Sequence, residues 1–269
     1  MNIVLYILIF IIGSLFGSFC ATAVYRIPQK MNIFKIRSYC PECRHRLSWK
    51  ESIPILSYMF LGGKCQNCKK RIRPRYFIYE VLSGVIFIVL ALALNLSIEN
   101  VTLNLIIELI FLILYLGAIF IIAGIDAENR KIEKNVIYYA LAILILYMIY
   151  LCIIDMSSIY RYILYVAVII ILLIIDTLIL KNKAKNNYTL SILILAFIMA
   201  VFSGEVATIW AIIYTLLIVA IMLILKRVKI KRKNIKKKEE NISNNLPIGF
   251  YLCITDIISL IVVMFLNNL

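Results

Sequence analysis

Long apolar stretches separated by short polar loops dominate the hydrophobic pattern of this chain. A helix needs about 20 mostly apolar residues to cross the hydrocarbon core of a bilayer. The pattern predicts eight such spans, at about residues 3–25, 77–95, 103–125, 136–154, 161–180, 189–203, 206–226 and 248–266. The sequence therefore predicts an all-α fold, a polytopic bundle of about eight transmembrane helices. The first span has no basic region before it and no small-residue cleavage site, so we expect a retained anchor.

Composition supports this prediction. Of the 269 residues, 64% are hydrophobic and 16% are charged, whereas a soluble domain is about 45–50% apolar and about 25% charged. An ordinary soluble enzyme and a disordered protein are both excluded. The chain has 29 Lys and Arg against 14 Asp and Glu, which gives a net charge of +15. In a membrane protein such an excess is first a sign of topology.

The basic residues lie in alternate loops. Residues 26–76, 126–135, 181–188 and 226–247 contain every Lys and Arg except Arg161, which marks the start of the fifth span. Basic loops stay in the cytoplasm, so we expect both termini outside and these four loops inside. Topology and attraction to anionic lipid explain the charge, and no nucleic-acid partner is needed.

The first basic loop carries four of the seven cysteines, in two Cys-x-x-Cys pairs. Two such pairs can wrap one tetrahedral ion with four thiolates, and a site closed by four protein ligands is structural. A cytoplasmic loop faces a reducing compartment, which disfavours disulfides. We expect a structural zinc site, and four unliganded thiols remain the alternative. The ligands would be Cys40, Cys43, Cys65 and Cys68.

Residues around this loop resemble the bacterial prepilin peptidases, also called type IV leader peptidases. The resemblance rests on these motifs: Gly17-Ser18-Phe19, Tyr25-Arg26-Ile27-Pro28, the two cysteine pairs, Leu47-x-Trp49, Ile53-Pro54-x-Leu56-Ser57-Tyr58, Gly63-Lys64 and Arg75-Tyr76-x-x-x-Glu80. It implies an integral-membrane aspartic endopeptidase that cuts the leader from type IV prepilins or pseudopilins at the cytoplasmic face. In many members the cysteine loop serves a second activity, N-methylation of the new N-terminus with S-adenosylmethionine. Binding of that cofactor is implied by the resemblance alone, because the chain has no glycine-rich nucleotide motif.

The resemblance divides the chain into a first transmembrane helix (1–25), a four-cysteine loop (26–76) and a transmembrane aspartic peptidase core (77–269). Arg26, Arg75 and Glu80 lie at the cytoplasmic ends of the first two spans. They could anchor the helices in the bilayer, or hold the cysteine loop against them.

The carboxylates needed for cleavage are harder to place. Asp126 ends the third span, where the family has its first catalytic aspartate. The family's second aspartate lies in a Gly-x-Gly-Asp motif at the start of the sixth span, but residues 183–190 contain neither the glycines nor an aspartate. Asp176, about 7 Å before the end of the fifth span at 1.5 Å per residue, is the best alternative. Asp256 lies about 15 Å into the last span, too deep to face Asp126.

Two hypotheses follow. The leading one is an endopeptidase that uses Asp126 and a second carboxylate, for which Asp176 is the candidate, with or without N-methylation of the product as a second activity. The alternative is a relative that does not cut, either a methyltransferase alone or a non-catalytic pilin-assembly subunit. A zinc-stabilised transporter or scaffold is a third and weaker hypothesis. A carboxylate within about 6 Å of Asp126 would favour the first hypothesis, because groups at that range couple strongly.

Overall fold

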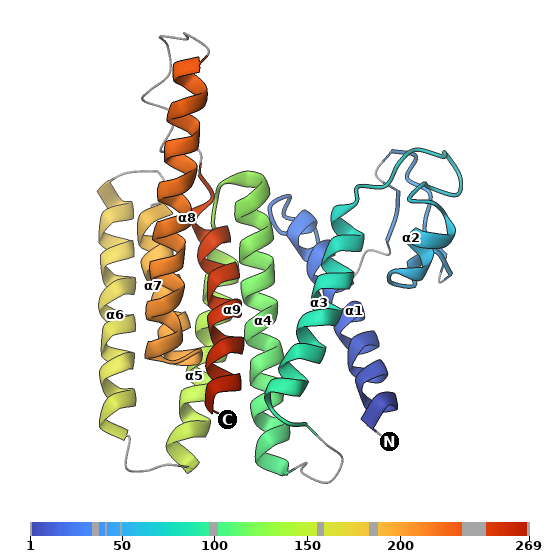
Figure 1. The fold of residues 1–269 in the computed structure, drawn as a ribbon. Coiled ribbons are helices and arrows are strands. Elements are labelled where there is room, and N and C mark those ends of the chain that lie inside the picture. Colours follow the sequence, from blue (N-terminus) through green and yellow to red (C-terminus); the bar gives the residue numbers. More distant parts are fainter. Residues whose placement is uncertain are drawn as a thin grey trace. The chain divides into compact units, whose positions relative to one another are not determined.

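The computed structural model describes residues 2–33, 38–40, 42–48, 50–96, 102–154, 159–182, 188–232 and 246–267. Each of the eight predicted spans is a helix (Figure 1). These helices are α1 (Asn2–Arg26), α3 (Arg75–Ala93), α4 (Leu103–Asn129), α5 (Lys134–Ile154), α6 (Ile159–Asn182), α7 (Tyr188–Phe202), α8 (Glu205–Arg232) and α9 (Ile248–Asn267). Within the cysteine loop lie a short 3₁₀ helix, η1 (Lys50–Ser52), and α2 (Leu56–Phe60). The predicted all-α fold is confirmed.

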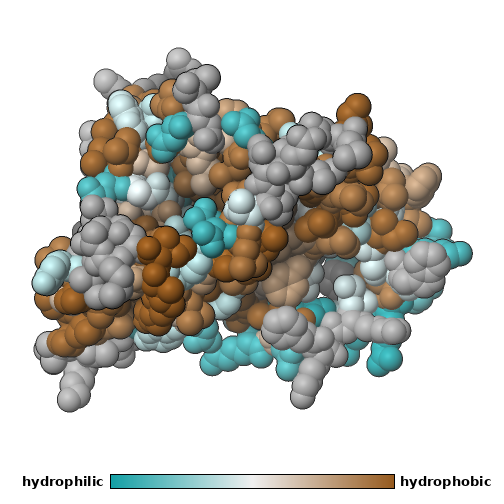
Figure 2. All heavy atoms as spheres, turned by 90° about the horizontal axis from the view of Figure 1, so that it is seen from below, coloured by the Kyte–Doolittle hydropathy of each residue, from teal (hydrophilic) through white to brown (hydrophobic). Residues whose placement is uncertain are grey.

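Among the described residues, six helices are long and apolar enough to cross a membrane, namely α1, α3, α4, α5, α8 and α9. The other two predicted spans contain the shorter apolar stretches Tyr162–Ile175 and Tyr188–Phe202. Apolar side chains also cover outer surfaces of the helices: Leu216, for example, is 63% exposed. Figure 2 shows apolar residues over much of one face. Such surfaces suit contact with lipid.

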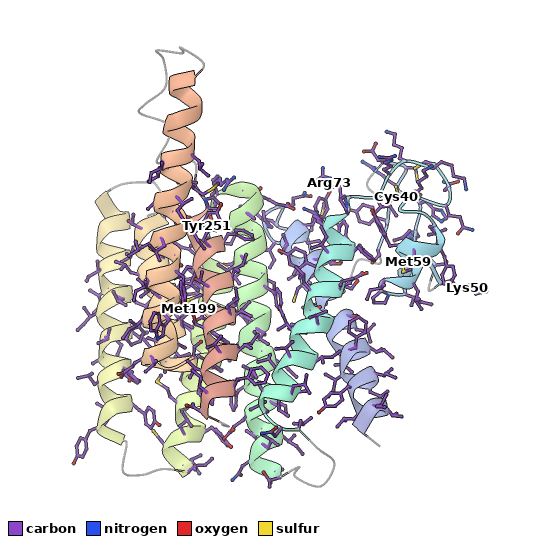
Figure 3. All side chains as sticks on the ribbon, in the orientation of Figure 1. Cys40, Lys50, Met59, Arg73, Met199 and Tyr251 are labelled. Atoms are coloured by element: carbon purple, nitrogen blue, oxygen red, sulfur yellow. The ribbon has the colours of Figure 1, made fainter. Side chains whose placement is uncertain are left out.

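The chain forms two compact units. Unit 1 comprises Met1–Leu103 and contains α1, the cysteine loop, α2 and α3, whereas unit 2 comprises Asn104–Asn267 and contains α4 to α9. In unit 2 the interior is built around the second half of α4, where Leu116, Ile119 and Ile122 are almost completely buried. Met199 of α7 is also fully buried in this interior (Figure 3). Unit 2 therefore has a core of its own.

In unit 1, α1 and α3 pack closely at Gly17. A Cβ atom on Gly17 would lie 2.0 Å from Ser83 Oγ and 2.5 Å from the carbonyl oxygen of Tyr79, so only glycine fits. The Ser83 hydroxyl donates a hydrogen bond of 2.5 Å to the carbonyl oxygen of Gly13. Small residues at close helix crossings are typical of packing in membranes. This contact explains the glycine of the Gly17-Ser18-Phe19 motif.

We expect Gly17→Ala to destabilise unit 1 by about 1–3 kcal/mol, the usual cost of forcing a methyl group into a packed interface. Alanine favours the helix itself, so the loss would report packing alone. The measurement is thermal unfolding of the purified protein in detergent. Ile12→Ala, which trims a side chain that is 55% exposed, is the control. Equal stability of both variants would contradict the close crossing.

Candidate functional sites

The two cysteine pairs form two knuckles with the same backbone pattern. In the first, the N–H of Cys40 donates to the carbonyl of His45 and the N–H of Arg44 donates to the carbonyl of Cys40, both at 2.9 Å. In the second, Cys65 bonds Lys70 at 2.9 Å and Lys69 bonds Cys65 at 3.0 Å. Arg44 and Lys69, one residue after each pair, both have φ of 57°. The equal spacing in the sequence therefore produces two equivalent turns.

These turns bring all four sulfur atoms together. In a tetrahedral zinc site with bonds of about 2.3 Å, the sulfurs lie about 3.8 Å apart. Here Cys40 Sγ and Cys68 Sγ are 3.8 Å apart, and Cys43 Sγ and Cys65 Sγ are 3.9 Å apart. All four sulfurs lie within 4.8 Å of one another. The cluster could hold a metal ion, and its donor set and spacing suit zinc.

Backbone hydrogen bonds to two of the sulfurs support the same interpretation, whereas desolvation and the neighbouring sulfurs raise the pKa of Cys68 to about 11. A hydrogen bond from the backbone N–H of His45 lowers the pKa of the Cys43 thiol to about 7. The backbone N–H of Cys68 lowers the pKa of Cys65 in the same way. A lower pKa favours the thiolate, which is the form that binds metal. The knuckles are also joined by an ion pair of 2.5 Å between Lys70 and Glu42.

The cysteine loop is tied to the helices by two side chains of the family motifs. Glu80 of α3 accepts a hydrogen bond of 2.7 Å from the backbone N–H of Ile55, which has φ of 62°. Arg26, 5% exposed at the end of α1, donates to the carbonyl oxygen of Ile33 at 2.8 Å. Both contacts join a helix end to the loop. Of the two roles suggested by the sequence, they fit that of a support for the loop.

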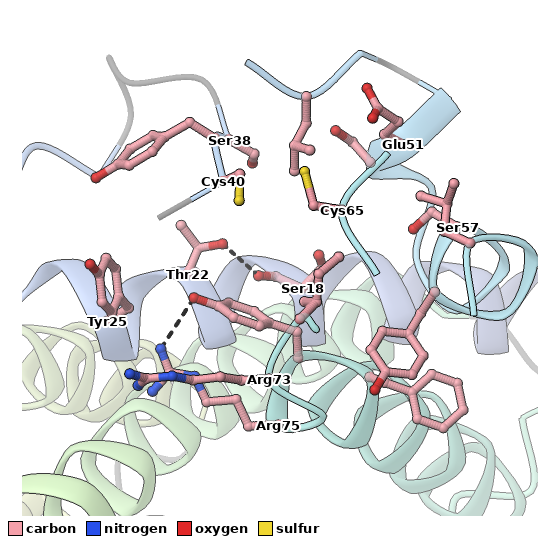
Figure 4. A pocket seen from close by; sticks show the side chains of 18 of the residues that line it. Ser18, Thr22, Tyr25, Ser38, Cys40, Glu51, Ser57, Cys65, Arg73 and Arg75 are labelled. Carbon is pink, nitrogen blue, oxygen red and sulfur yellow. Dashed lines mark hydrogen bonds between the residues drawn. The ribbon is translucent and has the colours of Figure 1, made fainter. Parts of the chain in front are cut away.

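Between the loop and these helix ends lies a cavity of about 250 Å³ (Figure 4). Its wall combines carboxylates, guanidinium groups and aromatic rings. Arg75 extends over the rings of Tyr25 and Tyr76, at 5.5 and 4.9 Å from their centres. Many of the residues that carry the resemblance line this one cavity: Ser18, Tyr25, Arg26, Cys40, Leu47, Ser57, Tyr58, Cys65, Arg75, Tyr76 and Glu80. The motif residues, scattered along about 65 positions, therefore converge on one site.

In unit 2, Asp126 is completely buried near the end of α4. The hydroxyl of Tyr188, the first residue of α7, lies 2.9 and 2.8 Å from the two carboxylate oxygens. The backbone N–H of Phe250 donates to Oδ2 at 2.9 Å, and the N–H of Gly249 donates to the Tyr188 hydroxyl at 3.1 Å. Asp126 therefore joins three helices through hydrogen bonds.

These contacts place a carboxylate at the N-terminus of α9. The first N–H groups of a helix have no partner within it, and the helix dipole favours a negative charge there. A Cβ on Gly249 would lie 3.1 Å from Asp126 Oδ2, so glycine allows the close approach. Among the residues that the structure describes, the groups that hydrogen-bond Asp126 are a phenol and a backbone amide. This arrangement resembles a helix cap.

Tyr188 was missed by the sequence analysis, although it lies in the stretch where the second aspartate was sought. Only carboxylates were considered for this role, and a tyrosine gave no signal for it. A tyrosine hydroxyl has an ordinary pKa of about 10, far above that of a carboxyl group. It is therefore a much weaker acid than a carboxyl group.

We expect Tyr188→Phe to cost roughly 1.5–3 kcal/mol of stability, because a hydrogen bond to a charged group is lost from a buried position. Thermal unfolding in detergent would measure the loss. Tyr214→Phe, which changes a 44% exposed hydroxyl on α8, serves as the matched control. If the two variants unfold at the same temperature, the Tyr188–Asp126 bond does not stabilise unit 2.

Asp256 forms a separate buried cluster on α9. Its Oδ2 accepts hydrogen bonds from Tyr115 at 2.6 Å and Ser203 at 3.1 Å, and its side chain is fully buried. Six residues along the helix separate it from Phe250, a rise of about 9 Å. Asp126 and Asp256 therefore have different partners.

The side chain of Asp176, the tentative second carboxylate, lies outside the described part of the structure, and only its backbone is placed, in α6. Asp126 and Asp176 as a catalytic pair therefore stay a prediction.

Comparison with known proteins finds similarity in the N-terminal part of the chain. Residues 11–94 match the model of the bacterial peptidase A24 N-terminal domain. A protein of Myxococcus xanthus is 38% identical over 81 residues, which cover 30% of this chain and 24% of that protein. Relatives of Vibrio cholerae and Bacillus subtilis are 38% and 40% identical; the matches cover 30% and 34% of this chain and 35% and 37% of the relatives.

All three relatives are named prepilin leader peptidase/N-methyltransferase. The matches span between 24% and 37% of the lengths of these relatives. No solved structure matches this chain significantly.

Proposed function

We propose, from the match of residues 11–94 to the model of the bacterial A24 peptidase N-terminal domain, that the protein modifies the N-termini of type IV prepilins or pseudopilins. The observation that carries the proposal is the convergence of the motif residues on the cavity of unit 1, beside the cysteine cluster. The relatives are named for two activities, leader cleavage and N-methylation. The geometry supports methylation better than cleavage.

Methylation would take place in the cavity of unit 1. S-adenosylmethionine carries both a carboxylate and positive charge, and the wall offers partners for each. Arg73 or Arg75 could pair with the carboxylate, whereas Glu80 and the ring of Tyr25 suit positive charge. When bound, this cofactor supplies a methyl group on a positively charged sulfur. The task of the protein is then to hold an amine against that methyl group and to exclude water.

Leader cleavage is the second candidate. Asp126 favours it, because it is a buried carboxylate beside backbone N–H groups at the start of α9. Water activation by paired carboxylates needs one of them as base and the other as acid. The Tyr188 hydroxyl occupies the position that faces Asp126, and we therefore propose that Asp126 has a structural role. The peptidase hypothesis would need another carboxylate, such as Asp176.

The membrane setting and the metal complete the proposal. The helices and the family support a multi-pass membrane protein surrounded by lipid. We propose that the cysteine loop lies in the cytoplasm and that both termini lie outside, as the distribution of basic residues predicts. Zinc bound by Cys40, Cys43, Cys65 and Cys68 would then stabilise the loop that forms one wall of the cavity.

A transfer assay tests this function. The purified protein in detergent is mixed with methyl-labelled S-adenosylmethionine and a synthetic peptide that has the N-terminal sequence of a mature pilin. We expect label on the free N-terminal amine and none on the same peptide with an acetylated N-terminus. If the protein is zinc-loaded and the free amine stays unlabelled, methylation is not its function.

A further inference from the structure

Glu51 is a buried carboxylate in the wall of the unit 1 cavity that is satisfied on only one side. Its side chain is 6% exposed, and the residue lies in η1. Oε2 accepts a hydrogen bond of 2.8 Å from the backbone N–H of Ser48 and lies 3.7 Å from Nε2 of His45. The other oxygen, Oε1, is buried and has no hydrogen-bond partner among the described residues. Leaving a buried carboxylate oxygen without a donor costs free energy.

Three of the cations that line the cavity are engaged with other groups. Arg26 donates to the carbonyl oxygen of Ile33, and Lys70 pairs with Glu42. Arg75 donates to the hydroxyl of Tyr76 and extends over its ring. These contacts hold the three positive charges on groups other than Oε1 of Glu51. Oε1 is closed to solvent in the present side-chain conformation, so a donor in the cavity would complete its hydrogen bonding once the Glu51 side chain turns toward it.

Two glutamates in the wall of the cavity favour a positively charged donor. Glu51 and Glu80 both line the cavity, and each has one oxygen anchored by a backbone N–H of the cysteine loop, from Ser48 and Ile55 respectively. An ammonium group has three N–H donors and a compact positive charge, so it can bond two carboxylates and a hydroxyl at once. The hydroxyls of Ser57 and Tyr58 line the same cavity.

We propose that Glu51 binds the N-terminal ammonium group of the protein substrate in the cavity of unit 1. The role is positional, because a charge-assisted hydrogen bond to a buried carboxylate would orient the ammonium group within the site. The ammonium group must then release one proton to solvent before its nitrogen can accept a methyl group. The inference rests on the proposed function, and it adds the group that recognises the substrate's free N-terminus. His45 and the Ser48 N–H would keep Glu51 in place, since both contact its other oxygen.

Binding of a peptide tests this role without any chemical step. The full protein in detergent is titrated with a short peptide that carries the N-terminal sequence of a mature pilin, with a free or an acetylated N-terminus. We expect the acetylated peptide to bind at least about tenfold more weakly, and Glu51→Gln to weaken binding of the free peptide by a similar factor. The glutamine can still accept the Ser48 N–H, so the fold and the zinc content should be unchanged.

Glu133→Gln, which removes one negative charge outside unit 1, is the matched control and should bind the free peptide as the unaltered protein does. If Glu51→Gln binds the free peptide as tightly as the unaltered protein does, the role of Glu51 is overturned and the proposed function is not. If the unaltered protein bound neither peptide, both the inference and the proposed function would fail. Binding of Ca²⁺ that is lost in Glu51→Gln, with peptide binding unchanged, would show a metal site instead and overturn the inference.

Discussion

Replacing Cys65 by serine is expected to unfold the cysteine loop and to abolish its zinc content. Cys65 is 1% exposed and its sulfur lies 3.9 Å from that of Cys43, inside the four-cysteine cluster. In the described part of the loop, the two knuckles are closed by a few turn hydrogen bonds and two isolated β-bridges. Structural zinc supplies about 10–16 kcal/mol of apparent binding free energy in small zinc domains. This is the largest effect that we predict for a single substitution.

Metal analysis and limited proteolysis measure this effect together. The unaltered protein should contain one zinc ion per chain and should resist cleavage within the loop, whereas Cys65→Ser should contain none and be cut there. Cys152→Ser, which changes a half-buried cysteine of α5, should keep both properties. If the Cys65→Ser loop stays protected without metal, zinc is not what stabilises it.

The second large effect is expected for Asp126→Ala, at about 3 kcal/mol or more of stability. The substitution removes the acceptor of the Tyr188 hydroxyl and of the Phe250 N–H. A buried donor left without a partner costs about 1–3 kcal/mol, and here two donors are affected. Glu128→Ala, two residues later on the exposed surface of α4, should change stability by about 0.5 kcal/mol or less. Thermal unfolding of both variants in detergent provides the comparison.

Combining Asp126→Ala with Tyr188→Phe sharpens the test. Because both substitutions break the same contact, the double variant should lose clearly less stability than the sum of the two single losses. Additive losses would show that the two residues act independently and would contradict the proposed helix cap. We expect Asp126→Ala to lower methyl transfer only as far as it lowers the amount of folded protein, because Asp126 lies in unit 2 and the cavity lies in unit 1.

Most of the fold follows from hydropathy alone. In a bilayer the backbone N–H and C=O groups must form hydrogen bonds within each segment, so a long apolar stretch is expected to form a helix. The predicted span of 136–154, for example, is α5 (Lys134–Ile154). The cysteine cluster could also be predicted from the sequence, because each Cys-x-x-Cys pair forms a local turn and two such turns can bind one ion.

The partners of the carboxylates were not accessible in this way. Tyr188 is separated from Asp126 by 62 residues and becomes its partner only because α4 and α7 meet. A search for proton-exchanging carboxylates passes over a tyrosine. Glu51 is one of two glutamates in the loop of residues 26–76, and the sequence does not reveal that its side chain is 6% exposed. Burial of this kind depends on how the loop folds back over α1 and α3.

The central claim is that the protein methylates pilin N-termini without cutting their leaders. The most direct test is the intact mass of a prepilin from the same cell, produced with this protein, and of the same pilin produced with its leader already removed. We predict that the prepilin keeps its leader and that the shortened pilin gains one methyl group. Loss of the leader with the unaltered protein, and its retention with Asp126→Asn, would contradict the claim and establish the peptidase hypothesis instead.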